Sequence, residues 1–208
     1  MPVAELHFYT NPQSRGRIVR WMLEETGLDY DTTVLEYGTS MKSAAYLAIN
    51  PMGKVPAIVD KGTVVTEAAA ICAYLADLCA PGVLAPAVAD PARGTYYRWL
   101  FYGAGPLEMA VTARALGWEV PPERQGMVGF GSHGTVLDVL ERAVSGGPWL
   151  CGEQFTAADV YTGSGLVWGL QFGTVEQRPA FVDYAARLVA RPAAKRAQAL
   201  DDALLNGR

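Results

Sequence analysis

The 208-residue sequence predicts an α/β N-terminal domain, in the order β-α-β-α-β-β-α, followed by an all-α helical domain. Three observations lead to this fold class. Two short strand-like segments are each followed by a helical segment, which is typical of parallel strands joined by helices. The turn sequence Asp60-Lys61-Gly62 then joins two short strands into an antiparallel hairpin. Beyond residue 90 the hydrophobic spacing is helical throughout.

The first strand is expected over residues 5–10 and the first helix over 15–26. Between them, the segment TNPQS contains two residues that cap helices well, Asn11 and Ser14. Gly27 is suited to end the helix, because glycine adopts the left-handed conformation without a steric penalty. Ile18, Trp21 and Met22 follow helical spacing on the buried face, and the outer face is expected to carry Arg17, Arg20 and Glu24.

A second strand is expected over residues 30–36 and a short helix over 42–48. The hairpin then spans residues 57–66, and Thr66 is expected to cap the following helix. That helix completes the α/β domain. Its buried face is expected to be formed by Ile71, Cys72, Leu75 and Leu78.

The domain boundaries follow from a change in composition. Residues 1–80 form the α/β domain, a proline- and glycine-containing linker spans 81–89, and residues 90–208 form the helical domain. Two helices are expected at the end of the chain, one of them ending near Arg191.

Within the helical domain, one helix is expected over residues 90–116 with a kink near Pro106, because proline interrupts the backbone hydrogen bonds of a helix. A second helix is expected over 122–144. Thr156 and Asp159 have the spacing of a capping box at the start of a later helix, with Asp in place of the usual Glu or Gln.

Composition excludes several classes of protein. The formal net charge is −4 and the pI is about 5.2, which argues against nucleic-acid binding. No apolar run is long enough to span a bilayer, and the first residues lack the regions of a signal peptide. Three cysteines without CxxC spacing indicate reduced thiols, so a cytoplasmic location is expected. His7 and His133 lie far apart without neighbouring ligands, so no metal site is expected.

Pro56 stands at the head of the first hairpin strand, where it removes a backbone donor. One interpretation is that it simply begins an edge strand. The other is that the Val55–Pro56 bond is cis, so that the backbone N–H and C=O of Val55 point outward and pair with an extended peptide ligand.

Glu67 lies at the start of the next helix. The helix dipole alone favours a carboxylate there by about 0.3–1 kcal/mol, which is a sufficient structural explanation. The same helix start can also bind an anion through its free N–H groups. Together the two features suit a zwitterion, with Glu67 contacting an ammonium group and Lys54 supplying a cation for a second carboxylate.

Ser14 has either a capping role or a functional one, in which its hydroxyl donates to an anion. If that anion is a thiolate, the hydrogen bond contributes roughly 1.5–3 kcal/mol and the helix dipole about 0.3–1 kcal/mol. The sum corresponds to roughly 1.5–3 pKa units. A thiol with an ordinary pKa of about 8.5 is then largely ionised at neutral pH.

These features, in this order, resemble the cytosolic glutathione transferase family, most closely its bacterial members. The segments that carry the resemblance are YTNPQSRGRIVRWMLEETGLDY, NPMGKVPAIVDKGTVVTEAAAICAYLAD and GEQFTAADV. They look like the first helix, the glutathione site and the capping motif of the helical domain. The resemblance covers nearly the whole chain, and the combination of these motifs is highly specific.

The resemblance implies a thioredoxin-like N-terminal domain, a homodimer and glutathione as co-substrate. It implies a cis Val55–Pro56 bond, with the Val55 backbone paired to the cysteinyl residue of glutathione. It places Glu67 at the γ-glutamyl end and Lys54 near the glycyl carboxylate. Ser14 matches the residue with which serine-type members stabilise the thiolate. The implied activity is conjugation of glutathione to apolar electrophiles, for detoxification or small-molecule metabolism.

Two departures from the family pattern matter. Ala68 follows Glu67 where the family often has Ser, so a hydroxyl contact is lost while a backbone N–H is kept. No cysteine precedes Cys72, which disfavours the cysteine-type redox chemistry. Tyr9 and Asn11 lie close enough in sequence to Ser14 to substitute for it.

The electrophile pocket is expected between the loop 9–14 and the kinked helix. Its expected residues are Asn11, Tyr102, Pro106 and Met109, although Trp99 and its aromatic neighbours equally suit an interdomain core. Two further functions stay open. One is a glutathione-dependent peroxidase, isomerase or dehalogenase on the same fold, and the other is a non-catalytic binding or assembly protein.

Overall fold

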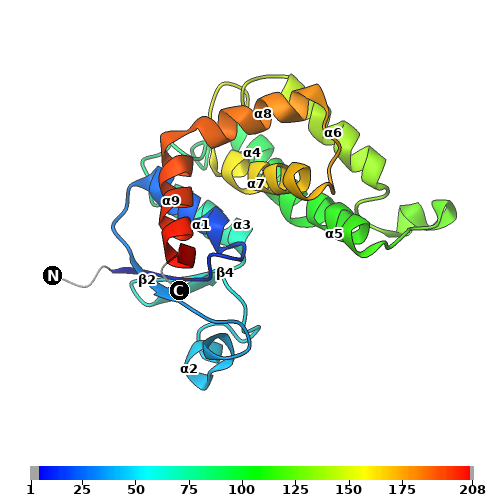
Figure 1. Ribbon diagram of the computed structural model, residues 1–208. Coiled ribbons are helices and arrows are strands. Elements are labelled where there is room, and N and C mark those ends of the chain that lie inside the picture. The colour runs from blue at the N-terminus through cyan, green and yellow to red at the C-terminus, as the bar shows by residue number, and fades with distance from the viewer. Residues whose placement is uncertain (1–4, 207–208) are drawn as a thin grey trace. The chain divides into compact units, whose positions relative to one another are not determined.

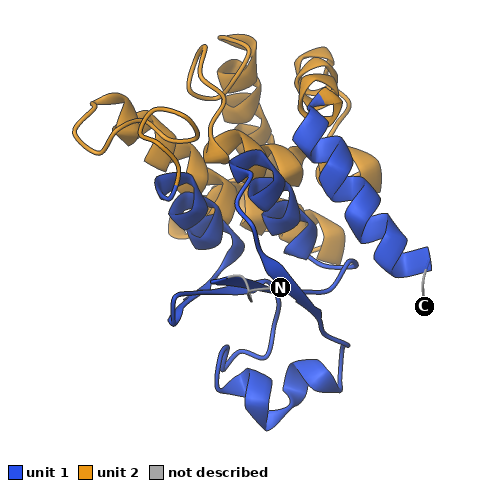
Figure 2. Ribbon diagram, turned by 90° about the vertical axis from the view of Figure 1, so that its left-hand side faces the viewer, with its two compact units in different colours: residues 1–78, 191–208 blue, residues 79–190 orange. Residues whose placement is uncertain are grey.

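The computed structural model describes residues 5–206. Residues 1–4 of the segment considered for a signal peptide therefore lie outside the described part. The chain divides into two compact units, coloured separately in Figure 2: unit 1 contains residues 1–78 and 191–208, and unit 2 contains residues 79–190. Within residues 5–206, no helix is both long and apolar enough to cross a membrane.

Unit 1 contains a four-stranded sheet in the order β2-β1-β3-β4. Strand β1 (Leu6–Thr10) pairs in parallel with β2 (Asp31–Val34) and antiparallel with β3 (Ala57–Asp60). Strand β4 (Thr63–Thr66) completes the predicted hairpin with β3. The thioredoxin-like N-terminal fold predicted from the sequence is confirmed.

Helices cover both faces of this sheet (Figure 1). Helix α1 (Gly16–Thr26) packs against α3 (Ala68–Asp77) and α9 (Pro192–Asn206). On the opposite face lie the short 3₁₀ turn η1 (Ser40–Lys42) and α2 (Ala44–Leu47). The core around α2 contains Leu35, Met41, Tyr46 and Ala57.

Helix α9 therefore belongs with the α/β unit by its contacts. The sequence assigned it to a helical domain spanning residues 90–208, since its pattern is helical like that of its neighbours. Ion pairs between residues far apart in sequence join it to α1. One of them joins Arg20 to Asp201, and both side chains are buried. The prediction that Arg20 lies on the outer face of its helix is wrong for this reason.

The hairpin turn agrees with the sequence, with Lys61 and Gly62 both at positive φ. The start of α3 differs from it. The residue at the N-cap is Glu67, not Thr66, and its side chain makes no capping hydrogen bond. Ile71 is fully buried as predicted, but Leu78 follows the end of the helix and is 42% exposed.

Unit 2 is all-helical, as predicted. Its elements are α4 (Ala92–Tyr102), the π-helical turn η2 (Gly103–Leu107), α5 (Glu108–Leu116), the 3₁₀ helix η3 (Pro122–Met127), α6 (His133–Ser145), α7 (Ala157–Phe172) and α8 (Pro179–Ala190). The kink predicted near Pro106 is the π-helical turn, which accommodates a residue without a backbone N–H.

The continuous helix predicted over residues 122–144 is wrong. Helix α6 begins only at His133, where the Ser132 hydroxyl accepts a hydrogen bond from the Thr135 N–H. The preceding segment contains several glycines, which destabilise a helix, and Gly131 has a φ of 63° that no α-helix contains.

The capping box at the start of α7 is confirmed. The Thr156 N–H donates to Asp159 Oδ2 at 2.9 Å, and the Ala158 N–H donates to Thr156 Oγ1 at 3.3 Å. Asp159 is fully buried, and its Oδ1 accepts hydrogen bonds from the Leu150 N–H and the Tyr184 hydroxyl. Burial raises the pKa of the Asp159 carboxyl, while these hydrogen bonds act in the opposite direction.

Candidate functional site

The loop between β1 and α1 is held by Asn11, whose side chain is fully buried. Its Nδ2 donates to the Leu35 C=O at 2.7 Å, and its Oδ1 accepts from the Gln13 N–H at 2.9 Å. Both ends of the amide therefore bind the protein itself. This arrangement supports a structural role for Asn11 in fixing the loop against the end of β2.

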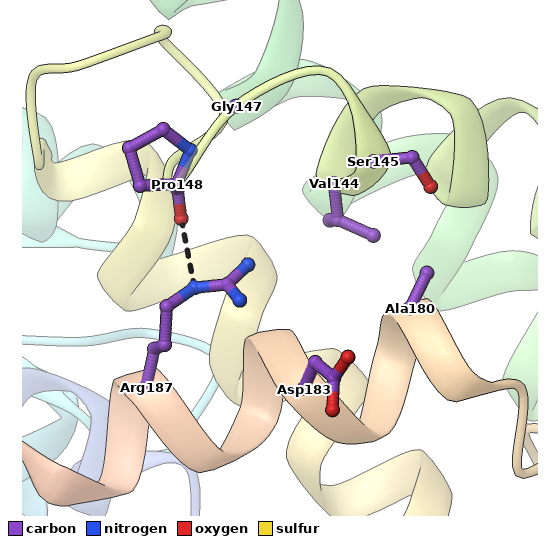
Figure 3. Close-up of a pocket in the computed structure, with 7 residues that line it drawn as sticks. All are labelled: Val144, Ser145, Gly147, Pro148, Ala180, Asp183 and Arg187. Atoms are coloured by element: carbon purple, nitrogen blue, oxygen red, sulfur yellow. Dashed lines mark hydrogen bonds between the residues drawn. The ribbon is translucent and has the colours of Figure 1, made fainter.

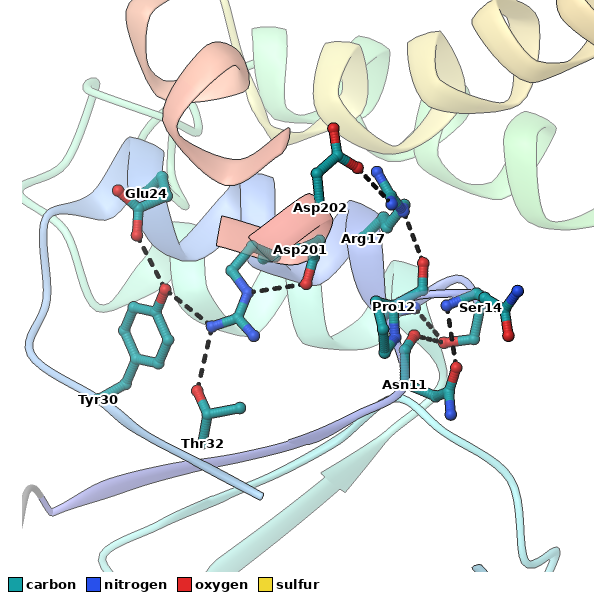
Figure 4. A network of polar contacts seen from close by, with 12 residues as sticks. Asn11, Pro12, Ser14, Arg17, Glu24, Tyr30, Thr32, Asp201 and Asp202 are labelled. Carbon is teal, nitrogen blue, oxygen red and sulfur yellow. Dashed lines mark hydrogen bonds and ion pairs between the residues drawn. The ribbon is translucent and has the colours of Figure 1, made fainter. Parts of the chain in front are cut away.

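Ser14 is partly exposed in the same loop, and its hydroxyl makes two hydrogen bonds (Figure 4). Oγ donates to the Asn11 C=O at 2.6 Å and accepts from the Gly16 N–H at 2.9 Å. The hydroxyl proton must therefore rotate away from the Asn11 C=O before Ser14 can donate to a ligand. Giving up a neutral hydrogen bond of this kind costs about 0.5–1.5 kcal/mol.

Tyr9 lies on the other face of the sheet. Side chains alternate along a strand, and its neighbour Phe8 lies beneath the guanidinium of Arg20 on the α1 face. The Tyr9 ring packs instead 5.6 Å from the ring of Tyr46, on the α2 face. Within residues 5–206 no hydrogen bond joins Tyr9 to Ser14, and the role of Tyr9 as a substitute stays a prediction.

The segment before β3 has an unpaired stretch of backbone. The Val55–Pro56 bond is cis, as the resemblance predicts. The Lys54 C=O accepts hydrogen bonds from the Tyr46 hydroxyl and from Asn50 Nδ2, whereas the Lys54 side chain is exposed. Among residues 5–206, no hydrogen bond is formed by the N–H or C=O of Val55. This backbone is available to a ligand.

Glu67 has an unusual backbone conformation, with φ 65° and ψ 116°. Such values cost a non-glycine residue about 1–3 kcal/mol and cluster at functional sites. The Glu67 side chain is exposed, while Ala68 behind it is buried. The residues that begin α3 leave backbone N–H groups without helical partners, as every helix start does.

Strand register brings these groups to one end of the sheet. Ala57 pairs with Tyr9 on one side and with Thr66 on the other. Pro56, Thr10 and Glu67 each lie one residue beyond these paired positions. The Val55 backbone, the loop bearing Ser14 and the start of α3 therefore lie at the same end of the sheet. They offer backbone for strand pairing, a hydroxyl group and the Glu67 carboxylate.

The remaining predicted site residues lie in unit 2. The Tyr102 hydroxyl donates to the Val136 C=O at 2.5 Å, and burial raises its pKa to about 12. Pro106 lies within the π-helical turn, and Met109 on α5 is 49% exposed. The hydroxyl of Tyr102 is thus committed to the protein, and Met109 presents an apolar side chain at the surface.

Unit 2 also has a pocket of about 470 Å³ between the end of α6 and helix α8 (Figure 3). It is lined by residues that include Val144, Asp183 and Arg187, whose Nε donates to the Pro148 C=O at 3.3 Å. None of the residues predicted for the site lines it.

The sequence analysis placed Arg17 and Arg20 on the outer face of α1 and did not predict the polar contacts that they make (Figure 4). Arg20 binds Asp201 Oδ1 at 3.2 Å and donates to Thr32 Oγ1 at 3.0 Å. Arg17 donates to the Pro12 C=O at 2.6 Å and to Asp202 at 2.7 Å. No local pattern indicates the ion pairs with Asp201 and Asp202, because these two partners are 181 and 185 residues away along the chain.

Groups of side chains suited to hold a metal ion are absent from the described residues, 5–206. Cys72 is fully buried on α3, and burial raises the pKa of its thiol. Neither observation adds a redox or metal centre to the site.

We therefore expect Cys72 to react with a maleimide at least about tenfold more slowly in the native protein than in denaturant, because only an accessible thiolate is nucleophilic. Mass spectrometry of the peptide that contains Cys72, with the denatured protein as control, measures this. Complete labelling of Cys72 in the native protein at neutral pH contradicts the packing of α3.

Comparison with known proteins gives consistent findings. Residues 14–78 match the family model described as "Glutathione S-transferase, N-terminal domain", and residues 106–192 match "Glutathione S-transferase, C-terminal domain". Glutathione S-transferase GstA of Escherichia coli O157:H7 is 35% identical over 124 residues, which are 59% of this chain and 61% of that protein. Maleylacetoacetate isomerase of Pseudomonas aeruginosa is 31% identical, covering 81% of this chain and 82% of that protein.

Among solved structures, a glutathione transferase from Methylococcus capsulatus aligns with a TM-score of 0.79 and 28% identity. The alignment covers 95% of this chain and 99% of the other.

Proposed function

Because the chain belongs to the glutathione S-transferase family, we propose that it binds glutathione, ionises the glutathione thiol and transfers it to a small apolar electrophile. One observation carries this proposal. The unpaired Val55 backbone, the start of α3 with Glu67 and the Ser14 loop meet at one end of the sheet.

For binding, the Val55 N–H and C=O pair with the cysteinyl backbone of glutathione as an added strand does. The start of α3, including the Ala68 N–H, takes the γ-glutamyl carboxylate. Glu67 contacts the γ-glutamyl ammonium, and the exposed Lys54 contacts the glycyl carboxylate. The Lys54 and Glu67 side chains are exposed, and the Val55 backbone makes no hydrogen bond within residues 5–206, whereas Ala68 is buried. Ala68 has no hydroxyl, so the contact with the γ-glutamyl carboxylate is weaker than in family members with Ser at that position.

For catalysis, the Ser14 hydroxyl rotates from the Asn11 C=O to donate to the glutathione sulfur, and Asn11 keeps the loop in place. A hydrogen bond to a charged group contributes roughly 1.5–3 kcal/mol, which exceeds the neutral bond given up. The thiolate then attacks the electrophile, and holding the two reactants together supplies much of the rate. For the electrophile we propose apolar contacts from unit 2 by Tyr102, Pro106 and Met109.

The test is retention on immobilised glutathione followed by assays with aryl halides and hydroperoxides. Retention with turnover of aryl halides supports transferase activity. Turnover of hydroperoxides alone favours a peroxidase, and retention without an ultraviolet thiolate signal favours a binding protein. Absence of retention argues against the whole proposal. A homodimer stays a prediction from the resemblance, and a cytoplasmic location stays a prediction from the cysteine pattern.

A second candidate is an isomerase in which the thiolate adds to a double bond and leaves again. The similarity to maleylacetoacetate isomerase over 81% of the chain favours it over a peroxidase or a dehalogenase. This isomerase uses the same ionised thiol, so thiol ionisation alone does not distinguish it from a transferase. An assay for cis–trans isomerisation of an unsaturated diketo acid does.

We expect Glu67→Gly to stabilise the fold while weakening glutathione binding. Glycine adopts the φ of 65° without strain, so the free energy of unfolding rises by about 1 kcal/mol. Loss of the carboxylate lowers the affinity for glutathione about tenfold, which corresponds to about 1.4 kcal/mol of binding free energy. Thermal denaturation and calorimetric titration measure the two effects.

Glu67→Gln is the matched control, because it keeps the strained backbone and removes only the charge. It is expected to lose affinity without gaining stability. Unchanged affinity in both variants contradicts the assignment of Glu67 to the γ-glutamyl end.

A further inference from the structure

Arg17 on the first turn of α1 connects the Ser14 loop to helix α9 (Figure 4). Its Nε donates to the Pro12 C=O at 2.6 Å, and its Nη2 donates to Asp202 Oδ1 at 2.7 Å. Pro12 lies two residues before Ser14 in the same loop. One guanidinium therefore joins this loop to a helix almost at the other end of the chain.

Helix α9 does not need this contact to stay on α1. Arg191 binds Glu25 through two nitrogens, at 2.7 and 2.8 Å, and the buried pair Arg20–Asp201 holds the middle of the helix. An exposed pair joins Arg196 to Glu24 at 3.0 Å. The pair of Arg17 with Asp202 is partly exposed, and such pairs contribute little to stability. Its effect is therefore expected on the loop and not on the docking of α9.

The loop has two anchors on different sides. Asn11 ties it to the end of β2 through the Leu35 C=O, and Arg17 ties it to α9 through the Pro12 C=O. The Ser14 hydroxyl is oriented by its hydrogen bond to the Asn11 C=O, in the part of the loop between the two anchors. A displacement of about 1 Å is enough to cost a reaction up to about a hundredfold in rate. The position of the Ser14 hydroxyl thus depends on both anchors.

We propose that Arg17 is a positioning residue for the Ser14 hydroxyl and that Asp202 of α9 orients Arg17 for this task. The inference rests on the proposed function, in which Ser14 donates to the glutathione sulfur. It assigns the C-terminal helix a part in setting the ionisation of the thiol, through one guanidinium with two partners.

A different role for Arg17, as a plain positive charge near the sulfur, predicts the opposite result when Asp202 is removed. Loss of a nearby negative charge favours the thiolate and lowers the pKa of the thiol. Loss of positioning weakens the hydrogen bond from Ser14 and raises that pKa. The direction of the shift therefore separates the two roles.

The test compares Asp202→Ala with Asp202→Glu and with Arg196→Gln, using the full chain. The readouts are the pH titration of the ultraviolet absorbance of bound glutathione, kcat, KM for glutathione and the thermal midpoint. Alanine is favoured within a helix, so Asp202→Ala is expected to fold. Arg196→Gln is the matched control, because it also removes an α9–α1 ion pair but has no contact with the loop.

We expect Asp202→Ala to raise the pKa of the bound thiol by about half to one unit and to lower kcat about three- to tenfold. KM for glutathione changes by less than about twofold, because the Val55 and Glu67 contacts remain. Asp202→Glu restores most of the loss, and Arg196→Gln leaves all three quantities unchanged.

A lowered or unchanged thiol pKa in Asp202→Ala overturns the inference while leaving the proposed function intact. A wild-type protein without any thiolate signal overturns both. A fall in the thermal midpoint of Asp202→Ala, with the thiol pKa unchanged, assigns the pair a structural role only and also overturns the inference.

Discussion

Ser14→Ala is expected to lower kcat/KM for conjugation about 10- to 150-fold and to raise the pKa of the bound glutathione thiol by about one to two units. The reason is the loss of a hydrogen bond to a charged sulfur, which contributes roughly 1.5–3 kcal/mol. KM for glutathione changes little, because the tripeptide is held by the Val55 backbone and the start of α3. Steady-state kinetics and the pH titration of thiolate absorbance measure these effects.

Ser14→Thr is the control, since it keeps a hydroxyl at the same position and is expected to retain most of the activity. Ser14 Oγ also accepts the Gly16 N–H, so the alanine variant loses up to about 1 kcal/mol of stability, too little to unfold the protein. An unchanged thiol pKa in a folded Ser14→Ala protein means that another donor ionises the thiol, and it contradicts the role of Ser14.

Asp159→Ala is expected to lower the free energy of unfolding by about 3–5 kcal/mol, a large part of the total for most domains. The carboxylate is fully buried and accepts hydrogen bonds from the Leu150 N–H, the Thr156 N–H and the Tyr184 hydroxyl. Its removal leaves three buried donors without an acceptor, each at a cost of about 1–3 kcal/mol before relaxation. Urea denaturation of the variant and the wild-type protein measures the difference.

Asp138→Ala serves as the matched control for Asp159→Ala. Asp138 also pairs with another side chain, that of Arg178, but its own side chain is 59% exposed, so the expected loss is below about 1 kcal/mol. Similar losses in the two variants contradict the expectation that the buried hydrogen bonds of Asp159 stabilise the fold more than an exposed ion pair does.

Local signals in the sequence were sufficient for much of the fold. The Lys61-Gly62 turn, the end of α1 at Gly27 and the Thr156–Asp159 box each depend on residues close together in the chain. The sheet followed from the order of strands and helices. These features do not require knowledge of distant contacts, so residue type and spacing determine them.

Contacts between residues far apart in the chain could not be predicted from local signals. Arg20 looks like a surface residue on its helix, and only Asp201 of α9 explains its burial. The segment before His133 has helical spacing, but its glycines favour other conformations. Glu67 takes the N-cap position in place of Thr66, with a backbone conformation that residue type does not predict.

In the candidate site, too, the residues of a local motif were predictable and the contacts between distant residues were not. Val55, Pro56 and Glu67 were recognisable from their motif, and the register of β3 explains why they lie together. The hydrogen bond from Ser14 to the Asn11 C=O and the connection from Pro12 through Arg17 to Asp202 appear only in three dimensions. The first of these contacts holds the Ser14 hydroxyl, and the second anchors the loop that bears it.

The most direct test of the proposed function is a titration of the wild-type protein with glutathione at neutral pH, followed by the ultraviolet absorbance of the thiolate. We predict a saturable increase, with an apparent thiol pKa well below the ordinary value of about 8.5, and no increase with S-methylglutathione. If glutathione binds without any thiolate absorbance, or does not bind, the claim that this site ionises the glutathione thiol is wrong.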